Sequence, residues 1–145
     1  MNPMSDTNPY IIANKGSFKG IRHWHELDAF WQHLETLNDG QWFIYDTNKT
    51  PPTSPSNTND FLNFLKRTNI LLHEQHQEDY CGIVYVDQFD NPEYIKIYDP
   101  ANLGVTCGYS DNPPLPGWIL SRITPCDLHP EKPPSLWKKY LHKFR

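Results

Sequence analysis

The sequence predicts a single α+β domain, in which an antiparallel sheet of about four strands carries two or three helices packed on one face. Two amphipathic segments, with apolar side chains at three- and four-residue steps, alternate with short segments rich in β-branched and aromatic residues. A chain of 145 residues suffices for one domain, and folding at that size removes about two-thirds of the unfolded surface from water. The mixed order of predicted helices and strands is typical of a layered α+β fold.

Residues 1–16 are polar, contain two prolines and show no sustained periodicity. Such a composition buries too little apolar surface to offset the ordering of the chain, so we expect a disordered or loosely docked arm. Tyr10, Ile11 and Ile12 are the side chains that could fix this arm to the body. The folded domain is then expected to span residues 17–145.

The first predicted helix begins at Trp24 and ends near Gly40, which suits a left-handed C-cap because it lacks a Cβ. Its apolar positions follow the helical period and are Trp24, Leu27, Phe30, Trp31, Leu34 and Leu37. A second helix is expected after the Pro-, Ser- and Asn-rich connector 47–59, with Thr58 or Asn59 as its N-cap. Its broad apolar face consists of Phe61, Leu62, Phe64, Leu65, Leu71 and Leu72.

Four segments have the composition of strands bounded by turn residues, namely 41–46, 81–87, 93–98 and 118–123. The second and third flank an Asp-Asn-Pro turn and are expected to form a hairpin. Side chains alternate between the faces of a strand, so Ile95 and Ile97 are expected to face the core. The same alternation turns Tyr94, Lys96 and Tyr98 outward.

Residues 135–145 have aromatic and apolar side chains at helical spacing with lysine and arginine around them. Eleven residues form no stable helix alone in water, so this segment is expected to dock on its own core. A membrane surface, a nucleic acid or a partner protein are the alternatives for such a basic aromatic stripe.

The long loop 99–117 is where we look first for function. A connection of this length without evident secondary structure is uncommon inside a compact domain and is usually functional or mobile. Its prolines restrict the free chain, so ordering it on a partner costs little entropy, which favours recognition over catalysis. The expected binding residues are the loop's polar, aromatic and proline side chains with the neighbouring tyrosines: Tyr94, Tyr98, Asn102, Tyr109, Pro113, Pro114 and Trp118.

Asp46 and Asp99 each follow a Tyr at the end of a predicted strand. If the two strands lie side by side and run parallel, this carboxylate pair could serve as general acid and base or hold a cation. The alternative, which we favour, is that each Asp accepts a hydrogen bond from the backbone two residues on and so stabilises a turn.

Cys107, between Thr106 and Gly108, is the thiol best placed to act as a nucleophile. Such a role requires a base or a positive field nearby. His73, His76 or His129 could supply the base, with Asp99 as its orienting group. A small side chain that packs the loop onto the sheet is the competing interpretation.

No complete set of metal ligands is evident. The close pairs of possible ligands are His23 with His25, His73 with His76, and Cys126 with His129. His73 and His76 lie one helical step apart if the second helix extends that far, so they are the metal candidates, but surface histidines are the preferred interpretation. We find no phosphate-binding glycine loop and no nucleophile elbow, and we expect neither a cofactor nor a resident metal.

Composition points to a cytoplasmic protein. Three cysteines, an odd number at wide spacing, do not form a secreted disulfide framework, and no apolar run reaches the roughly 20 residues of a membrane span. The N-terminus lacks the basic and apolar regions of a signal peptide. The net charge of −4 gives no general attraction to nucleic acid, so we do not expect a nucleic acid partner.

These observations lead to two functional hypotheses. The first is a small cytosolic accessory or regulatory module that binds a macromolecular partner, expected to be a protein, through the 99–118 loop and the adjacent tyrosines. The alternative is an enzyme, a hydrolase or transferase, with a pocket under that loop that uses Cys107 or the carboxylates of Asp46 and Asp99.

Overall fold

The computed structural model describes residues 7–79, 81–101 and 115–129, and these ranges form three helices and one five-stranded sheet. The helices are α2 (Pro9–Asn14), α3 (Trp24–Thr36) and α4 (Thr58–Gln75). The strands are β1 (Lys19–Gly20), β2 (Phe43–Asp46), β3 (Val84–Val86), β4 (Tyr94–Ile97) and β5 (Trp118–Ser121). The predicted single-domain α+β class is confirmed, and the sheet has one strand more than the sequence indicated.

The sheet is antiparallel throughout, in the order β1-β3-β4-β5-β2. The predicted hairpin is β3–β4, in which the Asp87 carboxylate accepts hydrogen bonds from the backbone N–H groups of Gln88 and Glu93. Because β2 and β4 both pair with β5, they run parallel to each other and their carboxyl ends lie at the same end of the sheet. This end of the sheet is where the 99–118 loop begins and ends.

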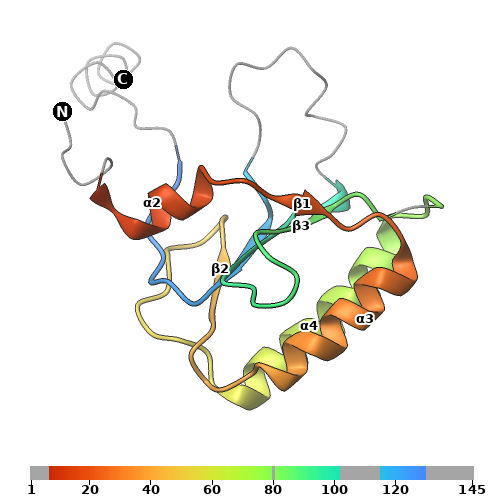
Figure 1. Ribbon diagram of the computed structural model, residues 1–145, viewed down its shortest axis with the longest axis horizontal. Coiled ribbons are helices and arrows are strands. Elements are labelled where there is room, and N and C mark those ends of the chain that lie inside the picture. The colour runs from red at the N-terminus through yellow and green to blue at the C-terminus, as the bar shows by residue number, and fades with distance from the viewer. Residues whose placement is uncertain (1–6, 80, 102–114, 130–145) are drawn as a thin grey trace, which may run out of the picture.

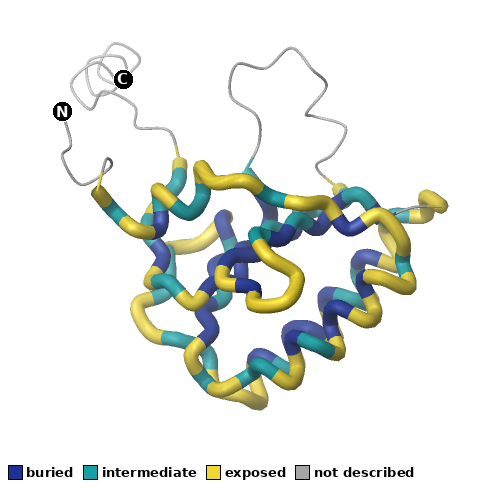
Figure 2. The backbone as a smooth tube through the Cα atoms, in the orientation of Figure 1, coloured by how far each residue is buried: buried dark blue, intermediate teal, exposed yellow. Residues whose placement is uncertain are grey.

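Helices α3 and α4 lie side by side on one face of the sheet (Figure 1). Trp31 Nε1 donates to Asn69 Oδ1 at their middle, and Asn38 at the end of α3 donates to the carbonyl of Thr58 at the start of α4, so the two helices are antiparallel. Both are buried along the sides that face the sheet and exposed on their outer sides (Figure 2).

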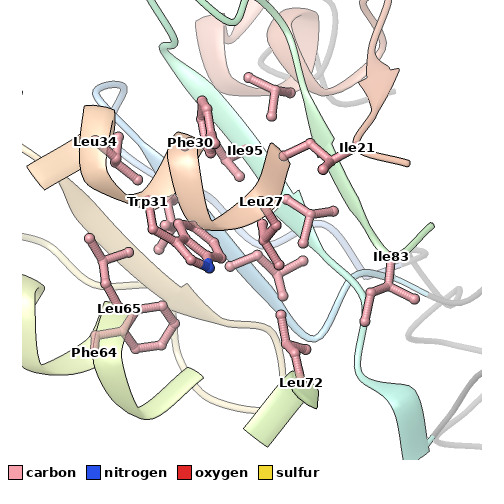
Figure 3. Packing of buried hydrophobic residues seen from close by; sticks show 14 of the residues in the cluster. Ile21, Leu27, Phe30, Trp31, Leu34, Phe64, Leu65, Leu72, Ile83 and Ile95 are labelled. Carbon is pink, nitrogen blue, oxygen red and sulfur yellow. The ribbon is translucent and has the colours of Figure 1, made fainter. Parts of the chain in front are cut away.

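The main core fills the space between these helices and the sheet (Figure 3). It contains most of the predicted apolar stripes of both helices and the inward-facing residues of β3, β4 and β5, including Ile95 and Ile97 as expected. Leu37, Leu62 and Leu71 of the predicted stripes are half-buried and lie outside this cluster. The N-cap of α4 is Asn57 rather than Thr58 or Asn59, the two predicted caps, and its Oδ1 accepts from the N–H of Asp60 at 2.8 Å. Gly40 has the predicted left-handed conformation, with φ of 80°, and lies three residues beyond the C-cap Leu37 of α3.

A second, smaller core lies on the other face of the sheet, where α2 covers it (Figure 1). Tyr10 of α2 is fully buried there, and its ring centroid lies 5.0 Å from that of Tyr94 and 6.4 Å from that of Tyr45. The expectation that the helices share one face therefore holds for α3 and α4 but not for α2. Residues 9–14 are a docked helix that belongs to the domain, so the interpretation of 1–16 as a disordered or loosely docked arm does not describe them.

The prediction that Tyr94 is exposed is wrong, because only 1% of its surface is accessible. Its side chain does point away from α3 and α4, but α2 and Phe18 cover it, and its hydroxyl donates to Asn14 Oδ1 at 2.9 Å.

The predicted C-terminal helix 135–145 lies outside the described residues. Among the residues described, no helix combines the length and the apolar character required to cross a bilayer.

Candidate functional site

The two ends of the 99–118 loop meet at the shared end of β4, β5 and β2. A Cβ built on Gly117 would lie 3.0 Å from Cβ of Asp99, so glycine allows this close approach of the loop ends without displacing Asp99. Thr47 is buried beside them, and its hydroxyl donates to the carbonyl of Pro116 at 2.7 Å while its N–H donates to the carbonyl of Gly117 at 3.1 Å. The loop therefore has a closed neck, held to the end of β2 by Thr47.

Asp46 and Asp99 both lie at this end of the sheet, on strands that run parallel to each other, but β5 separates them. Two strand spacings place their backbones about 10 Å apart, too far for two carboxyl groups to share a proton. Asp46 Oδ1 accepts from the N–H of Asn48 at 3.0 Å, and Asp99 Oδ1 accepts from the N–H of Ala101 at 2.9 Å. The favoured interpretation, that each Asp stabilises the turn after its strand, is confirmed.

A cavity of about 510 Å³ opens beside the neck, between α4 and the sheet; we call it the α4 cavity. The α4 wall consists of Phe64, Arg67, Thr68 and Leu71, whose three- and four-residue spacing places them on one face of the helix. Phe64 and Thr68 are buried, whereas Arg67 is exposed at the rim. The volume lies within the range of cavities that bind small ligands.

Strands β2 and β5 form the opposite wall with Ile44, Asp46 and Trp118, and the loop after β2 closes one side with Lys49, Thr50 and Pro52. The rings of Trp118 and Phe64 meet edge to face, with centroids 6.5 Å apart, and give the cavity an aromatic floor. Lys49 and Arg67 are cations and Asp46 is a carboxylate, so the lining carries a net positive charge within a chain of net charge −4.

The hydrogen bonding of β2 leaves part of its backbone facing outward. The N–H of Thr47 donates to the carbonyl of Gly117, and Tyr45 pairs with Ile119 two residues further along the same ladder. Hydrogen-bonded pairs alternate along an antiparallel ladder, so the odd-numbered residues of β2 exchange hydrogen bonds with β5. The even-numbered residues then direct their N–H and C=O groups to the open edge of the sheet.

The loop after β2 covers that edge at two points. The carbonyl of Trp42 accepts from the N–H of Ser56 at 2.8 Å, and the carbonyl of Asp46 accepts from the N–H of Lys49 at 2.9 Å. Ile44 lies between them, and its N–H and C=O have no partner among the described residues. The side chain of Ile44 lines the α4 cavity, so an unpaired backbone donor and acceptor lie directly beside the cavity.

A second hollow, of about 630 Å³, lies at the opposite edge of the sheet; we call it the β1 hollow. Lys19, Gly20 and Tyr85 contribute to it, together with Phe89, which is 39% exposed. The backbone of Gly20 faces the open edge, because β1 bonds to β3 through the residues on either side of it.

The histidines considered as metal ligands are occupied by other contacts. Trp24 packs against both, with ring centroids 4.3 Å from His73 and 6.0 Å from His76, and His73 Nε2 lies 3.6 Å from Asp28 Oδ1. Within the described ranges, no three His, Cys, Asp or Glu side chains come together as a metal site. His76 Nε2 is buried without a hydrogen-bond partner in this part of the chain, and we have no physical account of it.

The remaining predicted site residues divide into two groups. Trp118 lines the α4 cavity, while Tyr98 is half-buried against the core and meets Tyr85 edge to face at 5.6 Å, so burial raises the pKa of its hydroxyl. The others lie outside the described residues, and their predicted roles stay predictions: Asn102, Cys107, Tyr109, Pro113 and Pro114. The enzymatic hypothesis based on Cys107 likewise stays a prediction.

The second core contains polar groups whose ionisation is suppressed by burial. Desolvation raises the pKa of the hydroxyls of Tyr10, Tyr45 and Tyr94, and it lowers the pKa of Lys96. Lys96 Nζ donates to the carbonyl of Asn14 at 2.9 Å, so this half-buried amine holds α2 against the sheet. We therefore assign this cluster to docking of the helix.

Lys49, Arg67 and Ile44 are residues of the site that sequence reasoning missed. Arg67 lies three residues after Phe64, at the border of the apolar stripe of α4, and this spacing was the only feature of the local sequence that pointed to it.

Comparisons with protein-family models, with curated proteins and with solved structures find no match for this chain.

Proposed function

We propose that this protein is an interaction module, accessory or regulatory in role, that binds an extended segment of a partner protein in the α4 cavity, next to the 99–118 loop. The observation that carries the proposal is the position of the cavity. It lies beside the closed neck of the loop, and it brings together Asp46 and Trp118, two residues from sequence-predicted sites. A bound segment would thus lie beside the neck, where the loop begins and ends.

The lining favours binding over covalent chemistry. The Asp46 carboxylate accepts a hydrogen bond in the turn after β2, and none of the described residues that line the cavity beside the hydroxyl of Thr68 is a histidine. An aromatic floor with a polar, charged rim is the arrangement by which interfaces anchor one apolar side chain and orient its neighbours.

The α4 cavity suits a binding site better than the β1 hollow does. Buried aromatic and hydroxyl side chains line the former, whereas glycine backbone and exposed charges supply much of the latter. β1 is also only two residues long, so it offers fewer backbone groups with which an added strand could pair.

Site-specific photo-crosslinking tests this function. The photoreactive amino acid benzoylphenylalanine replaces Thr50 at the rim of the cavity, and in a matched control it replaces Ile12, which is 57% exposed on the opposite side of the sheet. We expect one protein from the native cytosol to crosslink at position 50 and not at position 12. A second variant, with residues 101–115 replaced by a Gly/Ser linker, is expected to lose it. Equal crosslinking at both positions, or none at position 50, contradicts the proposal.

We also propose that the module acts in the cytosol. The odd number of cysteines supports this, as do Cys81 and Cys126, both free thiols, of which Cys81 is buried. Fractionation of cells that produce the tagged chain tests it, and recovery in a secreted or membrane fraction contradicts it.

A further inference from the structure

The charges of the α4 cavity are arranged to receive an anion. Lys49 and Arg67 are exposed at its rim, and neither has a carboxylate within ion-pair distance among the described residues. Arg67 makes only a long contact, 3.4 Å from Nε to the carbonyl of Asn63 in its own helix. The lining carboxylate, Asp46, accepts a hydrogen bond from Asn48. Two cations are therefore available to a ligand.

The open edge of β2 selects among anionic ligands. Ile44 presents one N–H donor and one C=O acceptor side by side, and an extended polypeptide supplies the complementary acceptor and donor. A DNA backbone supplies phosphate acceptors without a matching donor for the carbonyl. The backbone groups thus favour a peptide as the source of the negative charge.

We propose that the α4 cavity recognises an extended acidic peptide. The peptide backbone pairs with Ile44 at the edge of β2, and an apolar side chain enters between Phe64 and Trp118. A neighbouring carboxylate meets Lys49 and Arg67. This inference rests on the proposed function and names the chemistry of its partner segment.

The geometry of an added strand supports this combination. Side chains at alternate positions of such a strand lie on the same face as those of Ile44 and Asp46, and that face opens into the cavity. An apolar residue and an acidic residue two positions apart would therefore both be directed into the cavity. The loop contacts of Trp42 and Asp46 limit pairing to the stretch around Ile44, so a short segment suffices.

Selection from a display library of random linear peptides on the full-length chain tests the inference. We expect the enriched peptides to carry an acidic residue beside an apolar one, and to lose binding when Thr50→Trp fills the entrance of the cavity. The double charge reversal K49E/R67E should weaken binding of a selected acidic peptide by about two- to thirtyfold, as expected for two exposed ion pairs. A selection repeated on K49E/R67E should enrich basic residues instead.

The matched control is K15E/K66E, which changes the net charge by the same amount at two exposed positions outside the cavity. This control should retain affinity for the acidic peptide. If Thr50→Trp abolishes binding of the selected peptides but these peptides show no preference for acidic residues, the present inference is wrong while the proposed function still holds. Failure to select any peptide that Thr50→Trp blocks overturns both.

Discussion

Replacing Tyr10 with Ala should cost a large part of the stability of the domain, because this is the fully buried side chain by which α2 packs on the sheet, beside the hydrogen bonds that Lys96 and Tyr94 donate to Asn14. Tyr10 is fully buried against Tyr94 and Tyr45. A buried aromatic side chain removes about 150–250 Å² from water, which at about 25 cal/mol per Å² corresponds to about 4–6 kcal/mol as an upper bound. Truncations of buried aromatic residues cost about 3–5 kcal/mol, and we expect Tyr10→Ala to fall in that range.

Urea unfolding followed by tryptophan fluorescence measures this loss. With a slope of about 2 kcal/mol per M, the expected destabilisation lowers the midpoint by about 1.5–2.5 M. Ile12→Ala is the matched control in the same helix, since Ile12 is largely exposed, and its effect should stay below about 0.5 kcal/mol. If the two variants differ by less than about 1 kcal/mol, α2 does not cover the second core as described.

Three further predictions concern charge, thiol reactivity and the neck of the loop. The Arg122 guanidinium donates to both carboxylate oxygens of Asp39, at 3.1 and 2.8 Å, and lowers the pKa of that carboxyl. Because the pKa of Asp39 is lower in the folded chain, its ionised form stabilises the fold above the unfolded pKa of about 4, and this stabilisation is lost as the pH falls through the native pKa. In urea titrations, the wild type should therefore be more stable than Asp39→Asn near neutral pH and should lose this advantage only in acid. A difference that does not change with pH contradicts this. Burial raises the pKa of the Cys81 thiol, so its alkylation by N-ethylmaleimide, followed by peptide mass spectrometry, should require unfolding, and rapid labelling of the folded chain would refute its burial. Gly117→Ala forces a Cβ against Asp99 and should lower the free energy of unfolding by about 1–3 kcal/mol, and an unchanged thermal midpoint argues against the closed neck.

The sequence was sufficient for elements whose signal is local. The stripes of α3 and α4 repeat over several turns, and the strand around Ile95 alternates clearly, so their positions were predicted within a few residues. β1 has two residues and α2 has six, which is too short for a periodic signal. Their presence depends on long-range contacts, above all the burial of Tyr10.

The burial of Tyr94 was missed for the same reason. Alternation correctly turned it away from the main core, but whether that face meets solvent depends on α2. The site was predictable only in part. Asp46 and Trp118 stood out beside turns and the long loop, whereas their place in one cavity with Arg67 follows from the strand order, in which β5 lies between β4 and β2.

Amide hydrogen exchange at the two open edges of the sheet tests the central claim most directly. In the free chain, the N–H of Ile44 should exchange faster than that of Tyr45, which bonds to β5. Saturation with a library-selected peptide should protect Ile44 and leave Gly20, at the β1 edge, unchanged. Protection of Gly20 with Ile44 unaffected would move the binding site to the β1 hollow and contradict the account.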